Sequence, residues 1–127
     1  MTTSIETVLS LKELYEAINS KVYSAKVTYK LSKLFAAVMK ESEFYAAQVN
    51  KLVNLYGQHD ENGQLIFTED QQGIRVQPDK LNEFQNKMTE LLELKIDLPD
   101  ITFTLDEVGE LSLSLQQFNL FLPFINE

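Results

Sequence analysis

Residues 28–57 of the chain are TYKLSKLFAAVMKESEFYAAQVNKLVNLYG, and this stretch decides the fold. Its apolar side chains recur every three or four residues, which is the spacing of one helix face. That face carries Leu31, Leu34, Phe35, Val38, Tyr45, Val49, Leu52, Val53 and Tyr56. The pattern predicts a helix from Thr28 to Tyr56, about 43 Å long at about 1.5 Å per residue. Gly57 is expected to end it in a left-handed conformation.

The residues that follow predict a β-hairpin and then a partner helix. Residues 60–63 (DENG) have turn chemistry, and residues 65–68 and 74–76 are short β-prone runs around an acidic, glutamine-rich loop. Pro78 is expected to open a helix that continues to about Glu93. The apolar face of that helix comprises Leu81, Phe84, Met88, Leu91 and Leu92.

Capping signals predict further short helices near both ends. Ser10 and Glu13 match a capping box, which predicts a first helix over about residues 10–19 after an extended segment that contains Ile5, Val8 and Leu9.

Toward the other end, residues 95–98 and 101–104 alternate like half-buried strands. Thr104 is expected to cap a short helical turn that Gly109 stops. Ser114 is expected to cap a last helix that Pro123 ends early.

These elements predict an α+β fold that is mostly α. A long helix and an antiparallel partner helix are joined by a β-hairpin, with short terminal strands and helices around them. A chain of 127 residues, 44% of them hydrophobic, is long enough for one core, so residues 1–127 are expected to form a single domain. The long helical pair has faces to bury, so we expect a homo-oligomer.

The charge of the chain is uneven. The formal net charge is −8, but residues 1–57 carry +2 and residues 58–127 carry −10. This balance disfavours direct binding of nucleic acid, which needs clustered lysine and arginine. Cysteine is absent, which excludes disulfides, thiol nucleophiles and cysteine-held metals. No apolar run is long enough to span a bilayer, so we expect a soluble protein that is not secreted.

No motif in the sequence predicts catalysis, a cofactor or a metal. His59 is the single histidine, and a solvated loop residue is the simpler interpretation. Asp60 and Glu61 begin like a calcium loop, but the ligand spacing is not met. The Asp106–Glu107 pair is explained by capping without an acid–base role. We therefore expect no enzyme, although an active site dispersed along the sequence stays an alternative.

Two groups of residues are candidates for partner binding. The first is the set of acidic residues in the second half of the chain, which would meet a basic partner. The second is a group of phenylalanines in the apolar run of residues 118–125, which either forms a docking surface or fills the domain's own core. The candidates are Asp60, Glu61, Glu69, Asp70, Asp97, Asp100, Asp106, Glu107, Glu110, Phe118, Phe121 and Phe124.

The stretch from Ser24 to Gly63, with residues 84–92 and 114–125, resembles a family of small uncharacterised proteins, of the domain-of-unknown-function kind. Tailed bacteriophages and prophages of Gram-positive bacteria encode this family. Its motifs are a helix, the end of that helix and a turn, so they specify no reaction. The resemblance implies a phage origin and a location in the cytoplasm of the bacterial host cell.

Three functions are compatible with these observations. The first is a phage accessory protein that acts by protein–protein contact, either on a host or defence factor or in phage assembly. The second is an acidic nucleic-acid mimic that inhibits a DNA-binding host enzyme, which requires carboxylates in rows on one continuous face. The third is an enzyme with a dispersed site, which requires a pocket lined by convergent polar groups.

Overall fold

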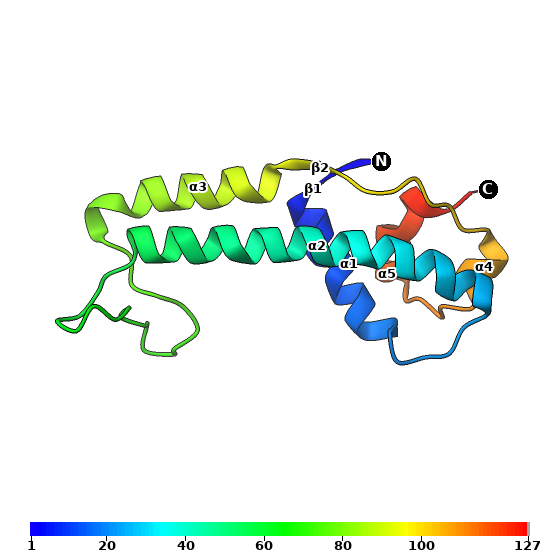
Figure 1. The fold of residues 1–127 in the computed structure, drawn as a ribbon, viewed down its shortest axis with the longest axis horizontal. Helices are drawn as coiled ribbons and strands as arrows, with labels where there is room; N and C mark the ends of the chain where they lie inside the picture. Colours follow the sequence, from blue (N-terminus) through cyan, green and yellow to red (C-terminus); the bar gives the residue numbers. More distant parts are fainter. Residues whose placement is uncertain (127) are drawn as a thin grey trace. The chain divides into compact units, whose positions relative to one another are not determined.

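The computed structural model describes residues 1–126, and most of these residues are helical (Figure 1). This confirms the predicted class, α+β and mostly α. Among the described residues, none of the helices combines the length and apolar character needed to cross a bilayer. The elements are β1 (Thr2–Ser4), α1 (Ile5–Ile18), α2 (Ala25–Tyr56), the 3-10 helix Pro78–Lys80, α3 (Leu81–Glu93), β2 (Lys95–Asp97), α4 (Leu105–Gly109), α5 (Leu115–Phe121) and the 3-10 helix Leu122–Phe124.

The chain folds into two compact units. We call residues 1–42 with 95–126 the terminal unit, and residues 43–94 the central unit. The first part of α2 belongs to the terminal unit and the rest of this helix to the central unit. The single-domain organisation expected from the sequence stays a prediction.

A two-stranded antiparallel sheet in the terminal unit joins the first residues of the chain to the segment that follows α3. β1 pairs with β2 in the register Thr2↔Asp97, Thr3↔Ile96 and Ser4↔Lys95. The strand expected at 95–98 is therefore confirmed. The second expected strand, at 101–104, is reduced to one parallel bridge between Phe103 and Ile125.

Helix α1 begins earlier than predicted. Its N-cap is Ser4, whose Oγ accepts a hydrogen bond from the backbone N–H of Thr7 at 3.3 Å. The predicted start at Ser10 is wrong, and Ile5, Val8 and Leu9 are helical instead of extended. Burial of Ile5 and Val8 at helical spacing decided the start, because apolar burial outweighs a local match to a capping pattern.

The core of the terminal unit is dense and aromatic. The rings of Phe103 and Phe121 have centroids 5.0 Å apart, and those of Phe121 and Phe124 are 5.4 Å apart. Full burial of such a side chain contributes about 1.5–3 kcal/mol. The other core residues are Val8, Leu11, Leu14, Ile18, Val27, Leu31, Leu34, Phe35, Val38, Leu98, Val108 and Leu111.

Both predicted capping boxes in the last third of the chain are present. The Thr104 side chain accepts from the backbone of Glu107, and the Ser114 side chain accepts from the backbone of Gln117. In turn, a side-chain oxygen of Glu107 and of Gln117 accepts a hydrogen bond from the backbone N–H of its cap residue. α5 ends at Phe121, just before the 3-10 helix that contains Pro123, as the proline predicts.

In the central unit, α3 lies beside the second part of α2 (Figure 1). The Tyr56 ring packs on Phe84 with centroids 5.9 Å apart. The Tyr56 hydroxyl also donates to Glu83 at 2.9 Å, and this bond is the main reason that the pKa of Tyr56 is raised. The helix expected from Pro78 to Glu93 is confirmed, with a first turn of 3-10 geometry.

Three extended segments lie between α2 and α3, around Gln58, Ile66 and Arg75. Backbone hydrogen bonds join them in a closed ring. Gln58 N–H donates to Arg75 C=O at 2.7 Å, Arg75 N–H to Ile66 C=O at 2.8 Å, and Ile66 N–H to Gln58 C=O at 2.9 Å. The expected hairpin pairing is present as an isolated antiparallel bridge between Phe67 and Ile74. Each segment therefore pairs with both of the others.

Gly57 is required for space and not for a left-handed backbone. The glycine with positive φ among the described residues is Gly63, at 80°, in the turn of residues 60–63. At Gly57 a Cβ atom would lie 2.6 Å from the Val53 carbonyl oxygen and 2.7 Å from Cδ2 of Leu65. The predicted left-handed conformation of Gly57 is therefore wrong, and the glycine is needed because Leu65 and Ile74 lie so close to the end of α2.

Candidate interaction site

The predicted partner-binding residues divide between the two units. Asp60, Glu61, Glu69 and Asp70 lie in the central unit. The five other acidic candidates and the three phenylalanines lie in the terminal unit.

Two acidic candidates of the terminal unit contact the first residues of the chain. Asp100 Oδ1 accepts from the Met1 ammonium group at 2.8 Å, and Asp97 Oδ1 accepts from Thr2 Oγ1 at 2.8 Å. The hydrogen bond and the positive charge of the ammonium group lower the pKa of Asp100. Both carboxylates thus reinforce the β1–β2 end of this unit.

Glu107 is a buried structural residue and is not available to a partner. Its Oε1 accepts from Lys30 Nζ and from the Thr104 backbone N–H, each at 2.8 Å. The Lys30 hydrogen bond, followed by the backbone bond, lowers the pKa of Glu107 to about 2. Oε2 is buried and has no hydrogen-bond partner among the described residues. The prediction that Glu107 binds a partner is corrected, because burial assigns it to the contact between α4 and α2.

Glu110 holds the start of α2. Its two carboxylate oxygens accept from the backbone N–H and the hydroxyl of Ser24, each at 2.9 Å. The Ser24 hydroxyl in turn accepts from the Val27 N–H. Asp106, in the first turn of α4, is exposed. Of the acidic candidates in this unit, Asp106 is the one for which no internal contact is described.

Two of the phenylalanine candidates belong to the core. Phe121 is 0% exposed and Phe124 is 1% exposed, so neither side chain reaches the surface. Their prediction as docking residues is corrected in favour of the alternative, since the aromatic core needs both rings. Phe118 is half-buried at the edge of this core.

The acidic candidates of the central unit lie in one loop. Residues 58–74, which we call the acidic loop, carry four carboxylates and no lysine or arginine. Asp60 Oδ1 accepts from the backbone of Asn62 and Gln64. Asp70 accepts from the Thr68 hydroxyl and the Gln72 backbone, and these bonds lower its pKa.

The acidic loop exposes both acidic groups and an aromatic side chain. Glu61 and Glu69 are exposed, and Phe67 is 56% exposed. His59, also in the loop, is exposed as expected. The loop therefore combines a rigid backbone, negative charge and an accessible ring.

The central unit has almost no buried side chains. Among its residues, only Tyr56 and Gly57 are buried. A groove of about 450 Å³ in this unit is lined by Val53, Phe67, residues 71–74, Val76 and Phe84. The large apolar side chains that are exposed here are Phe44, Leu55, Phe67, Leu81 and Leu94.

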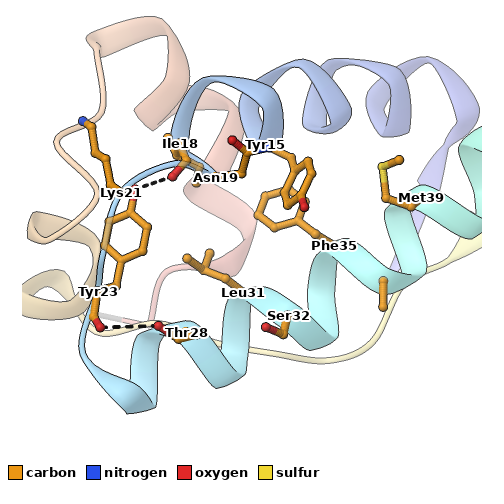
Figure 2. A pocket seen from close by; sticks show the side chains of 11 residues that line it. Tyr15, Ile18, Asn19, Lys21, Tyr23, Thr28, Leu31, Ser32, Phe35 and Met39 are labelled. Atoms are coloured by element: carbon orange, nitrogen blue, oxygen red, sulfur yellow. Dashed lines mark hydrogen bonds between the residues drawn. The ribbon is translucent and has the colours of Figure 1, made fainter.

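The terminal unit contains a second hollow, shown in Figure 2, which we call the tyrosine pocket. Its volume is about 380 Å³. Tyr15 and Phe35 contribute rings with centroids 5.1 Å apart. The Tyr23 hydroxyl donates to the Ile18 carbonyl at 2.8 Å, which holds the loop between α1 and α2 against the pocket. The full lining is Tyr15, Ile18, Asn19, Lys21, Tyr23, Thr28, Leu31, Ser32, Phe35, Ala36 and Met39.

No motif in the sequence predicts the tyrosine pocket. Its apolar lining was assigned only to helix faces, and the loop of residues 19–24 carried no motif. One signal was present, since residues 12–40 contain six lysines and two glutamates within an acidic chain. Within residues 1–126, no group of three or more histidine, aspartate or glutamate side chains is arranged to hold a metal ion.

Compared with family models, curated protein sequences and solved structures, the chain has no match in any of the three.

Proposed function

We propose that this chain is a small phage or prophage accessory protein that works in the cytoplasm of a bacterial host by binding another protein, without catalysis. The partner is a host or defence factor, or a phage component that the protein helps to assemble. The binding element is the long helix with its antiparallel partner and the extended segments that join them.

One observation carries the proposal. The central unit exposes large apolar side chains, among them Leu55 at 61% and Leu81 at 43%, while its own interior buries little. Exposed apolar side chains that gather into a large patch mark sites of interaction, and we infer that those of the central unit are covered by a partner. A second chain that covered these side chains would remove them from water at about 25 cal/mol per Å² of apolar area.

Capture of a partner tests the proposal. The tagged full chain is incubated with lysate from uninfected and phage-infected host cells, and bound proteins are quantified. We expect one partner at a stoichiometric level, and Leu81→Asp should remove it because a charge would enter the contact. Leu115→Asp is the matched control, since Leu115 is 78% exposed but lies in the terminal unit. A wild-type chain that captures no stoichiometric partner contradicts the proposal.

The acidic nucleic-acid mimic is a second candidate, and the acidic loop favours it. Asp97, Asp100, Glu107 and Glu110 favour it less, because each is already hydrogen-bonded within the terminal unit. A mimic should compete with DNA for a host enzyme, with an effect that weakens as salt increases.

A dispersed active site has less support. The tyrosine pocket offers hydroxyls and one lysine, and among the residues described its lining includes no carboxylate or imidazole. General acid–base chemistry usually relies on such groups.

A further inference from the structure

The lining and volume of the tyrosine pocket suit an apolar side chain. Ile18, Leu31 and Phe35 are buried beneath it, and the Tyr15 ring stands against Phe35 (Figure 2). Thr28 and Ser32 place hydroxyl groups on its rim. Its volume of about 380 Å³ lies within the range of sites that enclose a small group, about 300–1,000 Å³.

The surroundings of the pocket are positively charged. Lys21 lines the pocket itself. Lys12 precedes Tyr15 by three residues in α1, and Lys40 follows Ala36 by four residues in α2. Residues with these spacings share a helix face, so each lysine lies on the same helix face as a residue of the lining. Lys30 is not available, since it is paired with Glu107. The two glutamates of this stretch, Glu13 and Glu16, leave residues 12–40 with a net charge of +4.

The acidic loop has the complementary features. Phe67 is 56% exposed and two residues away from Glu69, and four carboxylates lie within the loop without a lysine or arginine. The closed ring of hydrogen bonds at Gln58, Ile66 and Arg75 holds the backbone next to Phe67 in place. A preformed loop loses little conformational entropy on binding.

We propose that the acidic loop of one copy of this chain docks on the tyrosine pocket of a second copy, with the Phe67 ring between Tyr15 and Met39 and the carboxylates near Lys21 and Lys40. This inference rests on the proposed function, because it names one of the protein's partners. Complementary charge supports this occupant: Lys21 lines the pocket, and the acidic loop carries four carboxylates together with an exposed ring.

The two contacting surfaces differ, so the contact is head-to-tail. Such a contact repeats until the rotation closes a ring, or continues as a filament. Each copy then uses its loop on one neighbour and its pocket on the next. A head-to-tail contact therefore predicts that a copy with a defective loop can still pair with a copy that has a defective pocket. A symmetric dimer does not predict this pairing.

Two variants test the contact. Phe67→Asp removes the ring from the loop and keeps the pocket, whereas Ala36→Trp fills the pocket and keeps the loop. Light scattering should find an oligomer for the wild type and a monomer for each variant alone. An equimolar mixture of the two variants should form a dimer and nothing larger, because one intact loop and one intact pocket remain. Circular dichroism checks that both variants fold.

Leu115→Asp is the control variant, and it should keep the wild-type oligomer. Raising the salt concentration should weaken the wild-type assembly, since the contact joins opposite charges. A wild-type chain that stays monomeric, an oligomer that survives Phe67→Asp, or a variant mixture that stays monomeric each overturns the inference. Capture of a lysate partner by a monomeric chain would leave the proposed function standing, whereas self-association without any lysate partner would leave this inference standing alone.

Discussion

The two units of this protein are stabilised in different ways. In the terminal unit, apolar side chains from α1, α2 and the last thirty residues fill a core with rings such as Phe103 and Phe121 at its centre. In the central unit, backbone hydrogen bonds fix the extended segments while the apolar side chains around them stay partly exposed. From this difference we expect the terminal unit to supply most of the stability, and the low burial of the central unit supports the proposal that this unit binds a partner.

The largest effect is expected from Phe103→Ala in the terminal unit. Phe103 is fully buried against Phe121, and removal of such a ring costs about 3–5 kcal/mol of unfolding free energy. Phe84→Ala in the half-buried interior of the central unit should cost less, roughly 1–2 kcal/mol. Urea unfolding of both variants measures the two losses. Equal losses of unfolding free energy in the two variants would contradict the expected difference between the units.

A smaller and local effect is expected from Gly57→Ala. The new Cβ would overlap the Val53 carbonyl and Leu65, and such overpacking typically costs about 1–3 kcal/mol. Hydrogen exchange should increase at residues 57–77 and stay unchanged in α1. Gly73→Ala is the matched control, because the nearest atom to its Cβ would be 4.0 Å away. Faster exchange throughout the terminal unit would contradict the expected local effect.

The stability of the terminal unit should depend on acid through Glu107. The folded pKa is about 2 against an ordinary value of 4.5, so the contribution is fully present above about pH 4.5 and is lost as the pH falls toward 2. Thermal unfolding from pH 6 to pH 2 measures this loss. In Glu107→Gln the decline below pH 4.5 should be shallower. The control Asp106→Asn should keep the wild-type slope, and an unchanged slope in Glu107→Gln would refute the assignment.

The smallest effect is expected from Asp60→Ala in the acidic loop. The change removes two hydrogen bonds to the Asn62 and Gln64 backbones, each worth about 1 kcal/mol or less at an exposed site. Amide exchange at residues 60–64 should rise, with little change in the unfolding midpoint. Glu61→Ala should leave exchange in this turn as it is. A large drop in global stability would mean that the central unit depends on its turns more than its burial indicates.

Elements with local signals were predictable from the sequence. The α2 periodicity, Pro78, and the capping boxes at Thr104 and Ser114 each act within a few residues, and the structure contains all of them. The class of the fold followed from the same signals.

Features that depend on distant residues were not predictable. β1 pairs with β2 from the other end of the chain, and Glu107 is paired with Lys30 across 77 residues. The burial of Phe121 and the space needed at Gly57 likewise arise only when separate segments meet. The candidate site follows the same division: the negative charge of the acidic loop was visible in the sequence, whereas the tyrosine pocket required α1 and α2 to come together.

The closed ring of hydrogen bonds at Gln58, Ile66 and Arg75 also bears on aggregation. An extended segment with unused N–H and C=O groups is a template on which further chains can add strands without limit. Here the backbone N–H groups of Gln58, Ile66 and Arg75 each donate to a carbonyl oxygen of another segment of the same chain. The central unit can therefore expose apolar side chains while this part of its backbone offers little for amyloid-like growth.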